Sequence, residues 1–456
     1  MPPTLPLELC QQILEELSLL ASCKRQPDHD REEYRWALRE CILVSRAFRH
    51  SVLKHIYEHI DISNVDVPIG AISNYILKLR KLFEPPPNSR LEGIGRYVKN
   101  LTIFLNDPLP RRVEETTSET LSTIDDVTRD ENFVEVLRHL RGEDYGITSC
   151  TISLWSGPIQ IPLPGLFPWT NLSLDFRNAF YDLVHSPTLT SLDIRNIFLL
   201  PTRFLEGTHL AYLRSQNCPE LPYHIVYLVE NAIQQEDVVY PELETLVTDN
   251  TYPSQFLPGL VRNLKEYVTV VNEEAPFSIQ VARTTKTIEI AANSLKRVHI
   301  NHYGNMPLYS FDLSDLPHLT SFSHHHTRDS AYEFEDGDIA RLYQLLDTKA
   351  PLQSLMSLGI LVNYREFLVS NTFLTPFGEL ESSWKMIADL LSSSKKFPAL
   401  VQLAVTILVN VEVESYYDFD LDLFQWECRD RLEQCFSQLP SRITFRLMVN
   451  AHVSLV

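Results

Sequence analysis

A run of three histidines is the first stretch of this chain whose residue types could do chemistry. His324-His325-His326 offers three imidazoles, which are common ligands of transition metals. Neighbouring residues of a strand point to opposite faces, however, and no fourth ligand is evident nearby in the sequence. We therefore interpret the run as the solvated edge of a strand rather than as a metal site.

A second stretch has the spacing of a calcium-binding loop. Asp418, Asp420 and Asp422 alternate as the first three ligands of such a loop do. Leu423 stands where the turn requires glycine, and Arg429 stands where the last carboxylate would lie. The pattern therefore indicates a solvated acidic loop.

Signatures of catalysis are lacking in the sequence. There is no G-x-S-x-G elbow and no H-E-x-x-H helix, and Gly93-Ile94-Gly95 lacks the third glycine of a dinucleotide-binding loop. The seven cysteines are odd in number and show no C-x-x-C spacing. We predict no catalytic residue, metal or cofactor and hence no enzyme; an enzyme on an unrecognised α/β fold is the weaker alternative.

Composition predicts an intracellular globular protein. The 456 residues include 59 acidic and 40 basic side chains, for a formal net charge of -19. This charge disfavours binding to nucleic acid or an anionic membrane and favours basic protein partners. The sequence shows no secretory signal and no apolar stretch of the roughly 20 residues that span a bilayer. We expect a cytoplasmic or nuclear protein.

The elements expected to organise the chain begin with three short N-terminal helices. The first is predicted over residues 5–17, where Pro6 suits the first helical position. The second is predicted over residues 34–44, and the third begins after Ser45, a good N-cap residue. Three such helices offer more apolar surface than they can bury against one another, so part of it should face a partner.

The N-terminal residues resemble an F-box, the motif that docks on the Skp adaptor of cullin-RING ubiquitin ligases. Leu5-Pro6 followed by Glu8 opens the resemblance, and Val44-Ser45-Arg46-Ala47-Phe48 matches the Val-Ser/Cys-Arg-x-Trp/Phe run of that family. The resemblance implies an adaptor-binding surface made of Leu5, Pro6, Leu7, Ile13, Leu14, Leu17, Val44 and Phe48.

One segment departs from the F-box pattern. The family joins its first two helices by a few residues, whereas residues 18–33 of this chain form a polar, charged insert. The alternative interpretation of the N-terminal helices is an ordinary cap that covers the end of a larger core.

Beyond a proline run at 85–87, one short apolar phrase recurs with the spacing L-x-x-L-x-I. Leu189 to Ile194 and Leu295 to Ile300 are examples, and four such phrases are entered by Pro-x-Leu. Proline is tolerated just before a strand and fixes where the strand begins. We predict strands at these phrases; they are residues 98–103, 147–152, 169–174, 189–194, 210–213, 243–246, 264–267, 295–300, 319–322, 352–355 and 400–405.

These phrases resemble a degenerate leucine-rich-repeat solenoid, whose repeats run over roughly 20 to 29 residues. The resemblance implies an α/β fold: a short three-helix F-box-like domain over residues 1–63, a connecting helix and proline linker over 64–96, and an irregular repeat domain with a parallel sheet and a C-terminal cap over 97–456. An irregular α/β domain whose strands merely look alike is the alternative.

Taken together, the two resemblances imply the substrate-recognition subunit of a Skp/cullin/F-box ubiquitin ligase, as in the divergent F-box proteins of fungi. Such a chain tethers a target protein without catalysing its modification. The alternative is a repeat scaffold that binds partners outside the ubiquitin pathway. For the substrate surface we predict carboxylates that point outward between the apolar positions or lie in an acidic loop, namely Asp193, Glu244 and Glu333, facing a basic protein segment.

Overall fold

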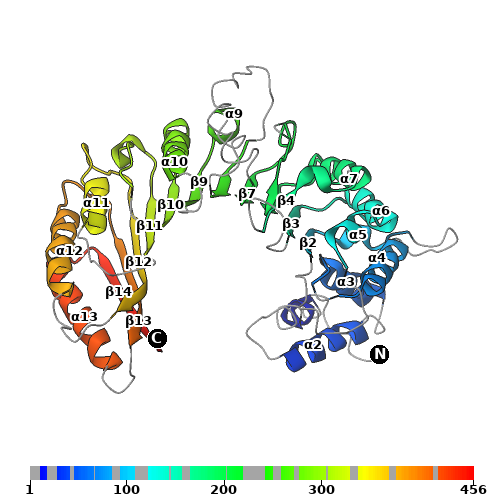
Figure 1. Ribbon diagram of the computed structural model, residues 1–456, viewed down its shortest axis with the longest axis horizontal. Helices are drawn as coiled ribbons and strands as arrows, with labels where there is room; N and C mark the ends of the chain where they lie inside the picture. The colour runs from blue at the N-terminus through cyan, green and yellow to red at the C-terminus, as the bar shows by residue number, and fades with distance from the viewer. Residues whose placement is uncertain are drawn as a thin grey trace, which may run out of the picture. The chain divides into compact units, whose positions relative to one another are not determined.

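The structure is a computed structural model, drawn as a ribbon in Figure 1. It consists of two compact units. Unit 1 comprises Met1–Ala211, Asn217–Glu220 and Val239–Pro241, and unit 2 comprises Tyr212–Gln216, Leu221–Val238 and Glu242–Val456. The residues that the structure describes are 11–17, 28–41, 46–65, 67–84, 93–107, 122–142, 145–156, 165–201, 203–218, 242–249, 258–271, 277–304, 307–328, 337–368, 376–413 and 420–455.

Unit 1 begins with helices that close a small core of their own. Residues 11–17 are helical, and α2 (Asp28–Cys41) and α3 (Arg46–Tyr57) follow. The side chains of Leu14, Leu38 and Val52 form the centre of this core. Packed around them are the partly buried side chains of Leu17, Tyr34, Cys41 and Ile56.

The second helix differs from its prediction at its start. It begins at Asp28, inside the segment predicted to be a polar excursion, and the predicted end at residue 44 lies outside the described residues. The segment Arg31-Glu32-Glu33 consists of residues with good helix propensity, so this part of the insert extends the helix instead of forming a loop.

The parallel strands of unit 1 follow these helices. Their order is β1 (His59–Ser63), β2 (Asn100–Asn106), β3 (Ser149–Trp155) and β5 (Ser191–Arg195), each paired with the next. The other elements of this unit are α4 (Ile69–Phe83), η1 (Ile94–Tyr97), α5 (Ile124–Thr128), α6 (Glu131–Leu140), the short pair β4 (Phe167–Pro168) and β6 (Ile197–Phe198), η2 (Trp169–Asn171) and α7 (Leu174–Val184).

The strand pairing of unit 1 includes β1, which lies inside the range 1–63 predicted for the first domain. Ile60 of β1 pairs in register with Leu101 of β2, and Ile62 pairs with Ile103. The N-terminal helices therefore belong to the same compact unit as the first strands. Whether residues 1–63 fold as a separate domain stays a prediction.

Unit 2 is a longer series of parallel strands with helices between them. Its strands are β7 (Tyr212–Gln216), β8 (Thr245–Thr248), β9 (Glu266–Val271), β10 (Arg297–Tyr303), β11 (Ser321–Arg328), β12 (Ser357–Leu368), β13 (Gln402–Val413) and β14 (Thr444–Leu455), in that order. The connections contain α9 (Pro258–Val261), α10 (Phe277–Ala291), η4 (Leu313–Asp315), α11 (Gly337–Leu346), α12 (Pro376–Ser392) and α13 (Leu421–Cys435).

Register places equivalent residues of the strands side by side. Tyr267 of β9, Val298 of β10 and Phe322 of β11 pair in one row, and all three are fully buried. Because side chains alternate along a strand, every second position lies on this buried inner face and the others lie on the outer face. Each unit thus has an α/β architecture with parallel strands, as the sequence predicted at that level.

One hydrogen-bonding arrangement recurs at the start of the strands. The carbonyl of Lys99 accepts from the backbone N–H groups of Thr148 (2.8 Å) and Ser149 (3.0 Å). The carbonyl of Lys296 accepts in the same way from Thr320 (2.8 Å) and Ser321 (3.1 Å). The residue just before one strand therefore sets where the next strand begins.

Most predicted strands are confirmed, and two strand predictions are corrected. Residues 169–174 form η2 and the start of α7, not a strand, because Ser173 caps a helix by accepting from the N–H of Phe176 (3.3 Å). Residues 352–355 are not in a strand: Gln353 and Ser354 form a turn, and β12 begins at Ser357. Between β2 and β3, α5 and α6 are separate helices, since Asp130 is the N-cap of the second.

We expect glycine-to-alanine substitution to have opposite effects on stability at two positions of unit 1. A Cβ on Gly146 would lie 2.1 Å from the Thr188 hydroxyl and 2.5 Å from the Gly142 carbonyl oxygen, whereas one on Gly70, in α4, would meet nothing within 4 Å. We expect Gly146→Ala to lower the free energy of unfolding by about 1–3 kcal/mol through this clash with backbone. Gly70→Ala should raise it by about 0.4–1 kcal/mol. Denaturant unfolding monitored by circular dichroism measures both, and an unchanged midpoint for Gly146→Ala would contradict the packing at this turn.

Candidate functional site

The predicted adaptor-binding residues divide into those that the structure describes and those that it does not. Leu5, Pro6, Leu7 and Val44 lie outside the described residues. Phe48 lies in α3, and its side chain is likewise outside the description.

Three predicted adaptor-binding side chains of the first helix can be placed. Ile13 is 47% exposed, whereas Leu14 is only 1% exposed and lies at the centre of the helical core. Leu17 is partly buried against the same core. Of these three, Ile13 is the side chain that offers a large apolar surface to a partner, and Leu14 and Leu17 support the helix that carries it.

An exposed tryptophan joins Ile13 on the N-terminal helices. Trp36 of α2 is 62% exposed. It lies two residues from both Tyr34 and Leu38, which pack in the helical core, and residues two apart on an α-helix do not share a face. Our sequence interpretation missed Trp36, although this spacing could have indicated it. Large aromatic side chains are enriched among residues that dominate protein interfaces.

The predicted substrate-binding carboxylates are already engaged by basic neighbours. On β5 of unit 1, Asp193 accepts from Nε (2.9 Å) and Nη2 (2.5 Å) of Arg195. Just before β8 of unit 2, Glu244 pairs with Lys265. Glu333 lies outside the described residues. The described carboxylates are therefore parts of ion pairs, so a basic partner would have to compete with the neighbouring arginine or lysine.

The outer face of unit 2 continues this polar pattern. Glu266 of β9 pairs with Arg297 of β10 (2.7 Å), and the Glu266 carboxylate raises the pKa of Arg297. His299 lies 2.5 Å from the hydroxyl of Ser323 on β11 and is partly buried. Burial lowers the pKa of His299. This face consequently offers hydrogen-bonding groups and paired charges to a partner.

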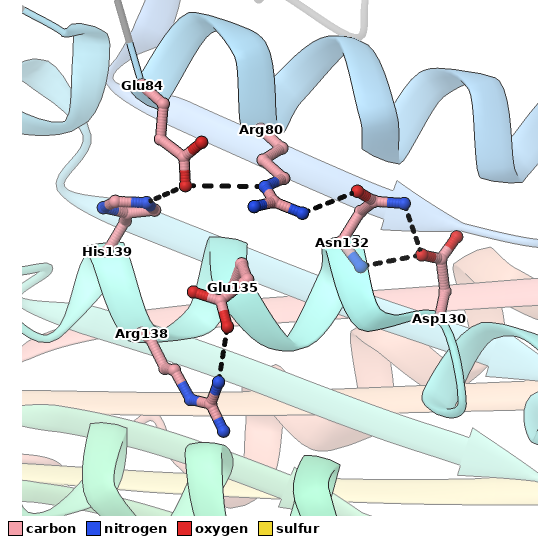
Figure 2. Close-up of polar contacts among 7 residues, drawn as sticks. All are labelled: Arg80, Glu84, Asp130, Asn132, Glu135, Arg138 and His139. Carbon is pink, nitrogen blue, oxygen red and sulfur yellow. Dashed lines mark hydrogen bonds and ion pairs between the residues drawn. The ribbon is translucent and has the colours of Figure 1, made fainter.

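A further polar cluster in unit 1 joins α4 to α6. Figure 2 shows Glu84 between two partners: its Oε1 lies 2.9 Å from His139 Nε2 and 3.4 Å from Arg80 Nε. Arg80 also donates to the side chain of Asn132 (3.1 Å). The hydrogen bond from His139 lowers the pKa of Glu84. These contacts tie the end of α4 to the neighbouring helix.

The same cluster has the spacing of a possible metal centre. The ligand atoms of Glu84, Glu135 and His139 all lie within 4.8 Å of one another. Both carboxylates are open to solvent and already paired with arginine, Glu84 with Arg80 and Glu135 with Arg138 (Figure 2). We interpret the cluster as an ion-pair network, because a cation would have to displace two arginines from it.

The histidine run is not a solvated strand edge, and that prediction was wrong. His324 and His326 of β11 are 1% and 3% exposed and lie on the inner face, whereas His325 points to the other face and is partly exposed. The alternation of side chains along a strand correctly placed His325 on the face opposite to His324 and His326. It did not indicate which of the two faces is buried. The rings of His324 and His326 stack on each other, and that of His326 stacks on His302 of β10.

The acidic stretch before α13 has a structural role. Asp420 is the N-cap of this helix, and its Oδ1 accepts from the N–H of Leu423 (2.9 Å). Asp422 follows in the first turn, where a negative charge is favourable at a helix N-terminus. Asp418 lies outside the described residues.

Comparisons with known proteins give the chain no family. No protein-family model matches it, and a search of curated proteins finds no match. Within the described ranges, no helix is both long enough and apolar enough to cross a membrane.

Proposed function

We propose that this protein is a substrate-recognition subunit of a Skp/cullin/F-box ubiquitin ligase. Its N-terminal helices bind the Skp adaptor, and its repeated strands hold a target protein. The chain catalyses no step itself and acts by raising the effective concentration of the target near the transferring enzyme.

The observation that carries the proposal is the apolar surface left over by the N-terminal helices. Their core is already closed around Leu14, Leu38 and Val52, yet Ile13 and Trp36 remain 47% and 62% exposed. An exposed isoleucine and tryptophan cost solvation free energy that a partner surface would recover. Both side chains lie within residues 1–63, the range whose sequence resembles an F-box.

The target-binding part of the proposal rests on the regularity of the strands. From β9 to β12 the parallel strands pair without a shift in register, and several strands begin where two backbone N–H groups donate to the carbonyl just before the neighbouring strand. A degenerate leucine-rich-repeat solenoid would supply such strands. In such a solenoid the outer strand face would present the polar residues near Glu266 and His299 to a protein segment. Its ion pairs would favour a partner that also carries both charges.

Co-purification with the Skp adaptor tests the proposal. We expect the full chain to bind the adaptor and the double variant Ile13→Glu/Trp36→Glu to lose at least about tenfold in affinity, because interface hot spots each contribute about 2 kcal/mol or more. Truncation at residue 64 is a poorer test, since it removes β1, which pairs with β2.

A matched control comes from the other end of the chain. Trp426 of α13 is also 62% exposed, so Trp426→Glu makes the same chemical change outside the proposed surface. This variant should bind adaptor like the unaltered chain. Failure of the unaltered chain to bind, or undiminished binding by the double variant, would reject the F-box assignment and favour a repeat scaffold outside the ubiquitin pathway.

A further inference from the structure

The inner face of unit 2 carries histidines where aliphatic side chains would be expected. His326 of β11 pairs in register with His302 of β10, and His324 pairs with Ile300. On the other side, both histidines of β11 pair with aliphatic residues of β12. Buried parallel strands are normally rich in valine, isoleucine and leucine, so three imidazoles in neighbouring inner-face positions depart from the rule.

These histidines are buried more completely than polar residues usually are. His302, His324 and His326 are each 3% exposed or less. Among the described residues, Nε2 of His324 and Nδ1 of His326 have no hydrogen-bond partner. A buried polar atom left without a partner costs about 1–3 kcal/mol, so an occupant that satisfies these nitrogens would stabilise the fold.

A carboxylate approaches the histidines from a third element. Asp338 lies in the first turn of α11, and its Oδ2 is 3.3 Å from Nε2 of His326. The other carboxylate oxygen is 3.8 Å from the guanidinium of Arg341, one turn further along the helix. The three imidazoles and this carboxylate are contributed by β10, β11 and α11, and Asp338 reaches them at His326.

We propose that His302, His324, His326 and Asp338 bind one divalent transition-metal ion, for which Zn²⁺ is the best fit. Imidazole nitrogen and carboxylate oxygen are the ligands that Zn²⁺ takes in proteins, commonly four in number. Four protein ligands leave no open position, so the ion would hold the two strands and the helix together rather than activate a substrate.

The arrangement of the rings shows what binding requires. The rings of His302 and His326 are parallel, with centroids 5.7 Å apart, and those of His324 and His326 are 6.5 Å apart. Zinc–nitrogen bonds are about 2.0–2.1 Å long, so binding turns the rings from stacking toward a common centre. Each imidazole binds the ion through a ring nitrogen that carries no proton.

The experiment measures zinc bound to the full chain after dialysis against a weak chelator. We expect one tightly bound zinc, and replacement by Co²⁺ should give the strong visible absorption of a tetrahedral site. His324→Ala should abolish both signals. Asp338→Asn keeps the shape of the side chain, so it should fold even if the histidine variant does not. It should weaken binding by at least about tenfold, because even partners of metal ligands contribute about 10–100-fold.

Two control variants locate the site. His325→Ala removes the imidazole that points to the opposite face of β11, and His139→Ala removes the only histidine of the solvent-exposed cluster on α6. Both should retain zinc and the cobalt spectrum. Zinc that is absent from the unaltered chain, that survives Asp338→Asn at full affinity, or that is lost with His139 would overturn the proposal.

Discussion

Replacing Phe322 by alanine is expected to lower the free energy of unfolding by about 3–5 kcal/mol, the range for removing a buried aromatic ring. Phe322 is fully buried in β11 and lies in register between Val298 of β10 and Leu358 of β12. Alanine would leave a cavity bounded by paired strands on both sides, which cannot close without breaking their register.

Phe322→Leu is the matched variant for this experiment. It keeps most of the apolar volume and should cost about 1–2 kcal/mol, within the range for reshaping a core. Urea unfolding of both variants, followed by tryptophan fluorescence and circular dichroism, gives the comparison. Equal and small losses for the two would mean that this row of side chains is loosely packed.

The second large effect is expected at Asn64, which is buried at the end of β1. Its side-chain amide donates to the carbonyls of Asn106 (2.8 Å) and Ser122 (3.0 Å), and its Oδ1 accepts from the N–H of Asn106 (2.7 Å). Asn64→Ala would leave three backbone groups without these bonds, so we expect a loss of about 3 kcal/mol.

Two further variants test whether the lost hydrogen bonds of Asn64 account for the loss of stability. Asn64→Asp keeps an acceptor for the N–H of Asn106 but places a carboxylate against two carbonyl oxygens, so it should not restore stability. The adjacent Ser63→Ala removes only an exposed 3.4 Å hydrogen bond to the N–H of Val65 and should change stability by less than about 0.5 kcal/mol. Rescue by Asn64→Asp, or equal effects of Ser63→Ala and Asn64→Ala, would contradict the hydrogen-bonding account.

The strands could be predicted from the sequence because their signal is local. Leu192 and Ile194 alternate with polar residues in β5, and both are buried as alternation predicts. The phrase at Trp169 failed for an equally local reason. Ser173 caps α7, and Phe176, Phe180 and Leu183 then follow at helical spacing on its buried side. The helix cap at Ser173 therefore decided the local structure, because the L-x-x-L-x-I spacing alone does not distinguish a strand from a helix.

The candidate sites depended on information that the sequence does not carry locally. Alternation places His324 and His326 on one face of β11, but the burial of that face comes from elements far along the chain. His302 lies on the preceding strand, beyond η4, and Asp338 follows on a separate helix. The exposure of Trp36, by contrast, could have been inferred locally, because Trp36 lies on the opposite side of α2 from the buried Leu38.

Several carbonyl groups just before the strands each accept hydrogen bonds from two backbone N–H groups, and this arrangement affects how the chain tolerates changes in the length of its connections. The carbonyl of Lys265, for example, aligns β10 by accepting from the N–H groups of Lys296 (2.8 Å) and Arg297 (3.0 Å), whatever the segment between them contains. Loop-closure entropy rises only slowly with length, so residues added to such a segment cost little. The connections are therefore where insertions can accumulate, or a reporter can be placed, while the side-chain rows of the strands remain in line.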